Sequence, residues 1–141
     1  MTREDLQAFF DRRDQHWRAR DAAALAAGHA PDGHVTSPMW RELDGREAIL
    51  ESYRSLFETF PDWEFNGQAL IIDGTMVAQP FSATATLEGE FMGLPGTHRR
   101  CQIEGARLYE MKNGLIHHER RLYDFTALLI QVGVLRSKPA Y

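Results

Sequence analysis

The spacing of apolar residues changes near Trp63 from a helical period to a strand period. Upstream, residues 3–20 and 44–60 repeat apolar side chains every three or four positions, as amphipathic helices do. Residues 63–71 instead alternate apolar and polar side chains, as a half-buried strand does. Helices followed by strands in a chain of 141 residues predict one α+β domain over residues 1–141.

Two helices are predicted before residue 30. Residues 3–20 form the first, and its buried face carries Leu6, Phe9, Phe10, Arg13 and Trp17. A short second helix covers residues 21–27, and the segment HAPDG ends it before a brief strand at residues 34–37.

A third helix is predicted to begin at Asp44, because Glu47 follows three residues later as in a capping box. Its apolar stripe consists of Ile49, Leu50, Tyr53, Leu56, Phe57 and Phe60. Pro61 should end the helix.

Turn signals divide the second half of the chain into strands. Asp73-Gly74 predicts a hairpin before a strand at residues 76–86, and Asn113-Gly114 predicts another between strands at residues 99–111 and 115–123. The glycine-rich loop GEFMGLPGTH separates the two hairpins. We expect a strongly curved antiparallel sheet with the helices on its concave side, which makes a cone-shaped barrel with a hollow.

Charge and composition limit the partners. The net charge is −4 with acidic and basic residues interspersed, so we expect neither nucleic acid nor an anionic membrane as a partner. The polar start MTREDLQAFFDRRDQHW lacks an apolar signal core, which predicts a cytoplasmic protein. The single cysteine, Cys101, predicts strand packing, and the histidines lack metal-ligand spacing, so we expect no metal and no cofactor.

Three stretches together resemble one protein family. The segments GREAILESYRSLFETFPDWEF, EGEFMGLPGTHRR and IHHERRLYDFTALLIQVG, in this order, are similar to the SnoaL-like polyketide cyclases of the nuclear-transport-factor-2-like superfamily. The resemblance implies a cone-shaped, cystatin-like α+β barrel over nearly the whole chain. The same fold carries ketosteroid isomerases, epoxide hydrolases and binding domains, so it does not fix the function.

Asp124 is the main catalytic candidate. It stands where a strand turns into a short apolar helix, next to Leu122, Phe125 and Leu128, and a carboxylate in apolar surroundings needs a partner or a proton. The resemblance adds that the cyclases have an acid–base aspartate just before a QLG-like stretch, which here is LIQVG. The alternative is that Asp124 only caps the helix.

Arg13 is the candidate partner of Asp124. A guanidinium near the centre of an apolar helix face needs an anion or carbonyl groups, although a purely structural ion pair would also satisfy it. Strict strand alternation places Ile116, His118, Arg120 and Leu122 inward with Asp124, and His117, Glu119, Arg121 and Tyr123 outward.

The remaining pocket candidates are mostly aromatic, and packing explains them equally well. Leu87 stands where the family often has a histidine, and His118 and Arg120 stand where it often has glutamate and tryptophan. The expected substrate-binding residues are Trp17, Tyr53, Phe81, Leu87, Phe91, His118 and Arg120.

These observations predict a cofactor-independent acid–base enzyme of the cyclase or isomerase type, acting on a small hydrophobic carbonyl compound in an apolar pocket. An epoxide hydrolase-like enzyme and a non-catalytic ligand-binding or dimerisation module stay open as alternatives. We also expect a homodimer through the outward face of the sheet, with Leu115 and Tyr123 beside balanced charges on Glu119 and Arg121.

Overall fold

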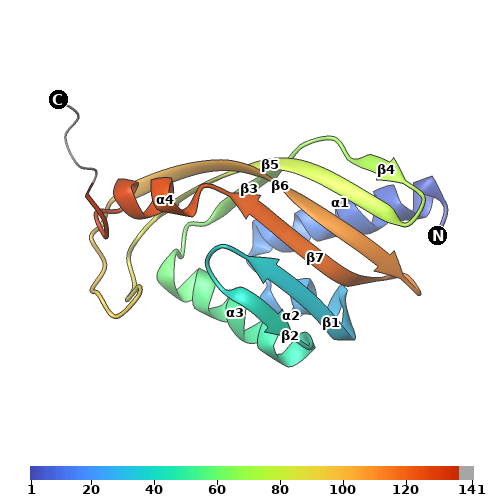
Figure 1. Cartoon of the computed structure of the whole chain (residues 1–141), viewed down its shortest axis with the longest axis horizontal. Helices are drawn as coiled ribbons and strands as arrows, with labels where there is room; N and C mark the ends of the chain where they lie inside the picture. The colour runs from blue at the N-terminus through green and yellow to red at the C-terminus, as the bar shows by residue number, and fades with distance from the viewer. Residues whose placement is uncertain (137–141) are drawn as a thin grey trace.

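The computed structural model describes residues 1–136, which contain four helices on a curved sheet (Figure 1). The helices are α1 (Arg3–Ala19), α2 (Ala22–Ala27), α3 (Arg46–Thr59) and α4 (Phe125–Gln131). The strands are β1 (His29–Ser37), β2 (Arg41–Asp44), β3 (Glu64–Gly67), β4 (Ile71–Asp73), β5 (Met76–Thr86), β6 (Arg100–Lys112) and β7 (Leu115–Tyr123). The predicted α+β order of elements is confirmed.

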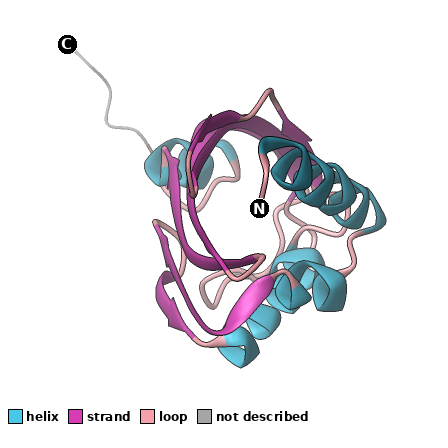
Figure 2. Ribbon diagram, turned by 90° about the vertical axis from the view of Figure 1, so that its right-hand side faces the viewer, coloured by secondary structure: helices cyan, strands magenta, loops and turns pink. Residues whose placement is uncertain are grey.

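The seven strands form one sheet with the order β2-β1-β7-β6-β5-β3, and β4 pairs with β5. Figure 2 shows this sheet curled around the interior, with helices closing the open side. All neighbouring strands are antiparallel except β1 and β7, which run parallel. The expected cone is confirmed, while the expectation of a wholly antiparallel sheet is corrected by this one pair.

The first helix forms as its sequence predicts. The Thr2 side chain accepts a hydrogen bond from the Asp5 backbone N–H at 3.0 Å, and the Asp5 carboxylate accepts one from the Thr2 N–H at 2.8 Å. This capping box satisfies backbone donors that would otherwise lack partners. The inward face of α1 carries Leu6, Phe10, Arg13 and Trp17, all buried, so the helix carries one guanidinium into the interior.

Two expectations before residue 61 are wrong. HAPDG does not break the chain but belongs to β1, and residues 41–44 form the unpredicted strand β2. Asp44 therefore pairs with His34 across β1 and β2 rather than capping α3. The cap of α3 is Gly45 at φ 88°, where glycine carries no Cβ penalty, and no side chain caps the helix.

A bulge in β7 decides which side chains enter the cone. Glu110 pairs with His118 but Met111 pairs with Ile116, so His117 has no partner on β6. One extra residue reverses the alternation, and Ile116, Glu119 and Arg121 are all buried. Strict alternation had placed Glu119 and Arg121 outside, and that prediction is wrong.

The interior is filled mainly by aromatic side chains. Phe60, Trp63, Phe65, Phe81 and Phe91 are all buried in one cluster. Phe57, although on the predicted apolar stripe of α3, is only half-buried.

We expect Phe60→Ala to lower the free energy of unfolding by about 3 to 5 kcal/mol, because Phe60 is fully buried and its removal leaves a cavity. Chemical denaturation measures the loss. Phe57→Ala is the matched control and should cost clearly less; equal losses would contradict this assignment of the core.

Within residues 1–136, no helix combines the length and the apolar character needed to cross a membrane.

Candidate functional site

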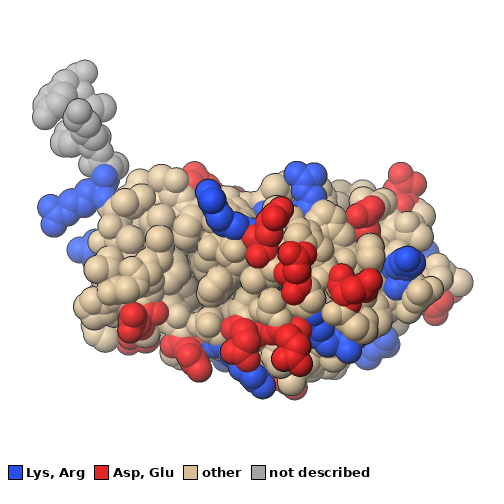
Figure 3. All heavy atoms as spheres, turned by 60° about the horizontal axis from the view of Figure 1, so that its bottom comes forward, with Lys and Arg blue, Asp and Glu red and all other residues tan. Residues whose placement is uncertain are grey.

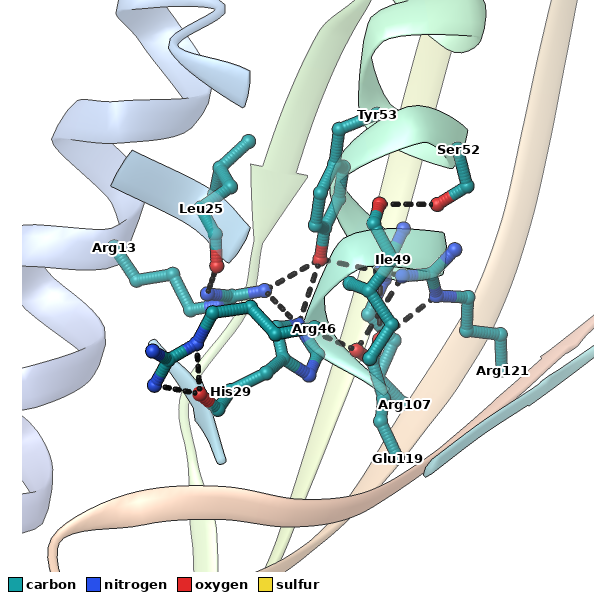
Figure 4. A network of polar contacts seen from close by, with 10 residues as sticks. All are labelled: Arg13, Leu25, His29, Arg46, Ile49, Ser52, Tyr53, Arg107, Glu119 and Arg121. Atoms are coloured by element: carbon teal, nitrogen blue, oxygen red, sulfur yellow. Dashed lines mark hydrogen bonds and ion pairs between the residues drawn. The ribbon is translucent and has the colours of Figure 1, made fainter. Parts of the chain in front are cut away.

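Six polar side chains meet inside the cone, where apolar residues would be expected. They come from α1, β1, α3, β6 and β7, and each is at most 6% exposed. We call them the buried polar cluster: Arg13, His29, Tyr53, Arg107, Glu119 and Arg121 (Figure 4). Buried polar groups are retained only when they are paired, so the contacts of each one matter.

The phenolic oxygen of Tyr53 is the centre of this cluster. It accepts hydrogen bonds from Arg13 Nη2 at 2.6 Å and from Arg121 Nη2 at 3.2 Å. His29 Nε2 lies 3.1 Å from the same oxygen. Both guanidinium groups can only donate, so the Tyr53 hydroxyl has its own proton free to donate to His29.

The contacts of His29 fix its tautomer. Arg13 Nη2 lies 3.1 Å from His29 Nε2 and can only donate, so Nε2 must accept and the ring proton sits on Nδ1. Burial lowers the pKa of His29 well below 6.5, and the nearby Arg13 lowers it further. The imidazole is therefore neutral at pH 7, and its Nε2 lone pair is shared between Arg13 and the Tyr53 hydroxyl.

Glu119 lies between two arginines. Its Oε2 accepts hydrogen bonds from Arg107 Nη1 at 2.8 Å and Arg121 Nε at 3.0 Å. Burial alone would raise the pKa of Glu119, but Arg121 and Arg107 outweigh it and hold that pKa far below the ordinary value. Glu119 is thus an ionised carboxylate that positions both arginines.

Three aromatic rings surround the Arg107 guanidinium. Its Cζ lies 4.9 Å from the ring centre of Trp17 and 5.1 Å from those of Phe65 and Phe81. Such cation–π contacts stabilise a desolvated guanidinium and hold it in place.

The charges of the cluster do not balance. The cluster holds three guanidinium groups but only one carboxylate, that of Glu119, and His29 is neutral, so positive charge is in excess. A site of this kind stabilises negative charge that develops on an oxygen, because the donors are fixed before the charge appears.

The lowered pKa of His29 predicts a loss of stability in mild acid. The unfolded chain binds a proton on His29 near pH 6.5 and the folded chain does not, so the free energy of unfolding should fall as the pH drops below that value. Denaturation curves at pH 7.5 to 5 measure the fall. His29→Gln should remove this part, whereas His16→Gln should not; an equal fall in His29→Gln would contradict the assignment.

Asp124 lies outside this cluster. Its side chain is exposed and accepts the Ala127 backbone N–H at 2.9 Å, so it is the N-cap of α4. The neighbouring Leu122 is 46% exposed, so the expected apolar enclosure is wrong. Asp124 borders an open recess of about 490 Å³ with Gln102 and Gln131, and the contacts of Arg13 are Leu25, His29 and Tyr53 instead.

The other predicted pocket residues fall into two groups. Trp17, Tyr53, Phe81, Leu87 and Phe91 are all buried in the interior cluster. His118 and Arg120 lie on the outer face of the sheet because of the bulge: His118 Nδ1 pairs with Glu110 at 3.3 Å, and Arg120 is exposed. Their predicted place in the pocket is wrong.

Sequence reasoning missed four members of the cluster. His29 was assigned to a break, and Glu119 and Arg121 to the wrong face. Arg107 had a usable signal, because Cys101, Ile103, Tyr109 and Met111 share its parity along β6 and are buried.

An apolar recess of about 330 Å³ lies near the α4 end of the cone. It is lined by five apolar residues, Met39, Trp40, Phe91, Met92 and Phe125, and by four polar residues, Ser55, Glu58, Thr59 and Glu90. On the molecular face shown in Figure 3, the end that carries α4 is largely uncharged, while acidic and basic side chains both lie on the remainder.

Tyr123 connects this recess to the cluster. Its ring contacts Phe125 at 6.4 Å between centres, and it is close enough to Arg121 and Arg107 for both to act on its pKa. Burial nevertheless raises the pKa of Tyr123 above its ordinary value. Tyr123 is therefore near both Arg121 and Phe125, a lining residue of the recess.

Within residues 1–136, no three His, Cys, Asp or Glu side chains are arranged to hold a metal ion.

Comparison with solved structures shows the same fold. AclR from Streptomyces galilaeus, a proposed hydroxylase, superposes with a TM-score of 0.83 at 20% identity over 98% of this chain and 87% of its own. TsrD from Streptomyces laurentii gives 0.83 at 18% identity, covering 96% and 99%. IdmH from Streptomyces antibioticus, a proposed polyketide cyclase, gives 0.74 at 24% identity, covering 90% and 97%. At these identities the likeness concerns the fold alone.

Comparison with curated protein sequences gave no match. The family model of the SnoaL-like polyketide cyclases, however, matches residues 7–132, which is most of the chain and includes every member of the buried polar cluster. The chain therefore belongs to the SnoaL-like polyketide cyclase family.

Proposed function

We propose that this protein is a cofactor-independent enzyme of the cyclase or isomerase type, and that it moves a proton at a carbon next to a carbonyl group of a hydrophobic substrate. The observation that carries the proposal is the Tyr53 oxygen, held between two guanidinium groups with the neutral His29 imidazole 3.1 Å away. This arrangement supplies a proton path and electrostatic stabilisation at one point.

In the proposed mechanism, the apolar recess receives the ring system and Tyr123 moves aside. The C–H bond next to the carbonyl breaks, its proton goes to the Tyr53 oxygen, and the Tyr53 proton passes to His29 Nε2. The electron pair shifts onto the carbonyl oxygen to form an enolate, which Arg121 and Arg13 stabilise. Imidazolium and enolate appear together, so the charge of the site does not change.

The enolate has two productive outcomes. Its carbon can attack a second carbonyl, which closes a ring and leaves an alkoxide, or it can take a proton at another carbon, which completes an isomerisation. In both cases His29 returns its proton through Tyr53. Family membership and the proposed cyclase activity of IdmH support this reaction class.

Deuterium exchange in D2O tests the proposal without knowledge of the natural substrate. Aryl ketones such as 1-tetralone and 2-tetralone exchange the hydrogens next to the carbonyl, and proton NMR follows the rate. We expect the wild-type protein to accelerate exchange of at least one member of such a panel, and variants of Tyr53 to lose this acceleration.

The structure also favours one competing function. Asp124 is engaged as a helix cap, which removes the main sequence argument for catalysis at that residue and suits a ligand-binding module. Saturable binding of these ketones without accelerated exchange would support the module. An epoxide hydrolase-like reaction would instead show as hydrolysis of styrene oxide that depends on Tyr53.

We further propose that the protein forms a homodimer through the outer face of the sheet. This face carries Leu122 and Leu108 beside the exposed Arg120, whereas Glu119 and Arg121 face the interior. Light scattering should give about twice 16.1 kDa, and Leu122→Arg should give the monomer because it places a new charge beside Arg120. A wild-type monomer at micromolar concentration would contradict the proposal.

A further inference from the structure

Arg107 and Arg121 form an adjacent pair inside the cone. They are direct partners across β6 and β7, and both donate to Oε2 of Glu119. Figure 4 shows their guanidinium groups next to each other beside Glu119. Two such cations approach each other only when an anion compensates their repulsion, and Glu119 supplies one negative charge.

The pair has donors to spare. Each guanidinium offers five N–H groups. Among the described residues, Arg107 uses Nη1 on Glu119 while its Nε is buried without a partner, and the hydrogen bonds of Arg121 run through Nε and Nη2. Neither Arg107 Nη2 nor Arg121 Nη1 donates to another side chain or carbonyl of residues 1–136.

We propose that this guanidinium pair binds a carboxylate of the substrate, so that the preferred ligand is a hydrophobic carboxylic acid. This inference rests on the proposed function, since it names the class of molecule on which that site acts. A carboxylate has the planar geometry that guanidinium groups bind through paired N–H donors. It also supplies the negative charge that the cluster lacks.

The surroundings favour an acid with a ring system. Tyr123 lies within electrostatic range of both guanidinium groups and contacts Phe125 on the wall of the apolar recess. A bound acid therefore directs its carboxylate toward Arg107 and Arg121 and its apolar part toward Met39, Phe91 and Phe125. A neutral ketone of the same shape fills the recess equally well but leaves the two cations without a counter-ion.

A matched pair of probes tests this on the wild-type protein. 2-Naphthoate and 2-naphthamide share their ring system and nearly their shape but differ by one charge. Trp17, stacked beside Arg107, provides a fluorescence signal for titration. We expect naphthoate to bind at least about tenfold more tightly than naphthamide, since hydrogen bonds to charged groups are stronger than neutral ones. Equal affinities, or no saturable change with naphthoate, would overturn the inference.

Two variants locate the effect. Arg121→Gln should abolish the preference for naphthoate over naphthamide. Arg120→Gln removes the same charge from the neighbouring residue on the outer face and should keep the preference. A preference that survives in Arg121→Gln would place the carboxylate elsewhere and overturn the assignment.

A third measurement tests the inference if the Arg121→Gln variant does not fold. If circular dichroism shows that Arg121→Gln does not fold, arginine Nε–Hε NMR signals of the wild-type protein decide the question. Those of Arg107 and Arg121 should shift with naphthoate and not with naphthamide; unchanged signals would overturn the inference. These binding results are separate from turnover, so the proton-transfer mechanism can fail while the carboxylate preference holds, and the reverse.

Discussion

Tyr53→Phe should lower the rate of ketone exchange by about 100-fold to 10,000-fold, the usual contribution of a positioned proton-transfer group. The substitution removes one oxygen, which alone within residues 1–136 contacts Arg13, Arg121 and His29 at once. The phenyl ring stays against Trp17, 5.6 Å away between ring centres, so the packing of α3 is kept. Exchange rates measured by NMR at equal protein concentration give the loss.

Tyr109→Phe is the matched control. Tyr109 is as deeply buried as Tyr53, but its hydroxyl has no hydrogen-bond partner among the described residues. Removing an unpaired buried hydroxyl costs nothing in hydrogen bonding, so Tyr109→Phe should keep full activity and full stability.

Asp124→Asn separates the two candidate sites. Asparagine caps a helix about as well as aspartate, so this variant should fold normally and, if the chemistry occurs at the buried polar cluster, keep its activity. Loss of activity in Asp124→Asn together with full activity in Tyr53→Phe would show that the reaction occurs at α4 and that the proposed mechanism is wrong.

Glu119→Gln should lower the free energy of unfolding by about 3 to 5 kcal/mol, the range for breaking a buried ion pair by removing one partner. Glutamine keeps the size of the side chain but loses the charge that two guanidinium groups share at 2.8 Å and 3.0 Å. Arg107 and Arg121 are then left as neighbouring buried cations. Urea denaturation at pH 7 measures the loss.

The control for this variant is Glu110→Gln. Glu110 also contacts a side chain of the next strand, His118 Nδ1 at 3.3 Å, but its own side chain is 50% exposed. Exposed polar pairs contribute little, so Glu110→Gln should change stability by less than about 1 kcal/mol. A loss of similar size in both variants would mean that Glu119 is not the charge on which the cluster depends.

Much of the fold could be predicted because local signals determine it. The Asn113-Gly114 turn, the strand at residues 76–86 and the helix starting at Arg3 each follow from residues close together in the chain. β2 was missed because it is four residues long and mostly exposed, which leaves no alternation to detect.

The site could be predicted only in part. Arg13 and Tyr53 stood out because each lies on the apolar face of a helix whose period is regular. Glu119 and Arg121 did not, because the alternation of side chains along one strand does not reveal a bulge. The bulge is visible only in the pairing of β7 with β6. His29 is the first residue of β1. Its burial likewise depends on residues that are distant in the sequence.

His117 thus has an effect far larger than its own contacts. It is the unpaired residue of the bulge, and the direction in which the later side chains of β7 point depends on its having no partner on β6. If His117 paired with a residue of β6 and the alternation ran unbroken from Ile116, Glu119 and Arg121 would face solvent, and Arg120 and Leu122 would face the interior. The same strand sequence therefore encodes two different interior chemistries, and the pairing of one histidine selects between them.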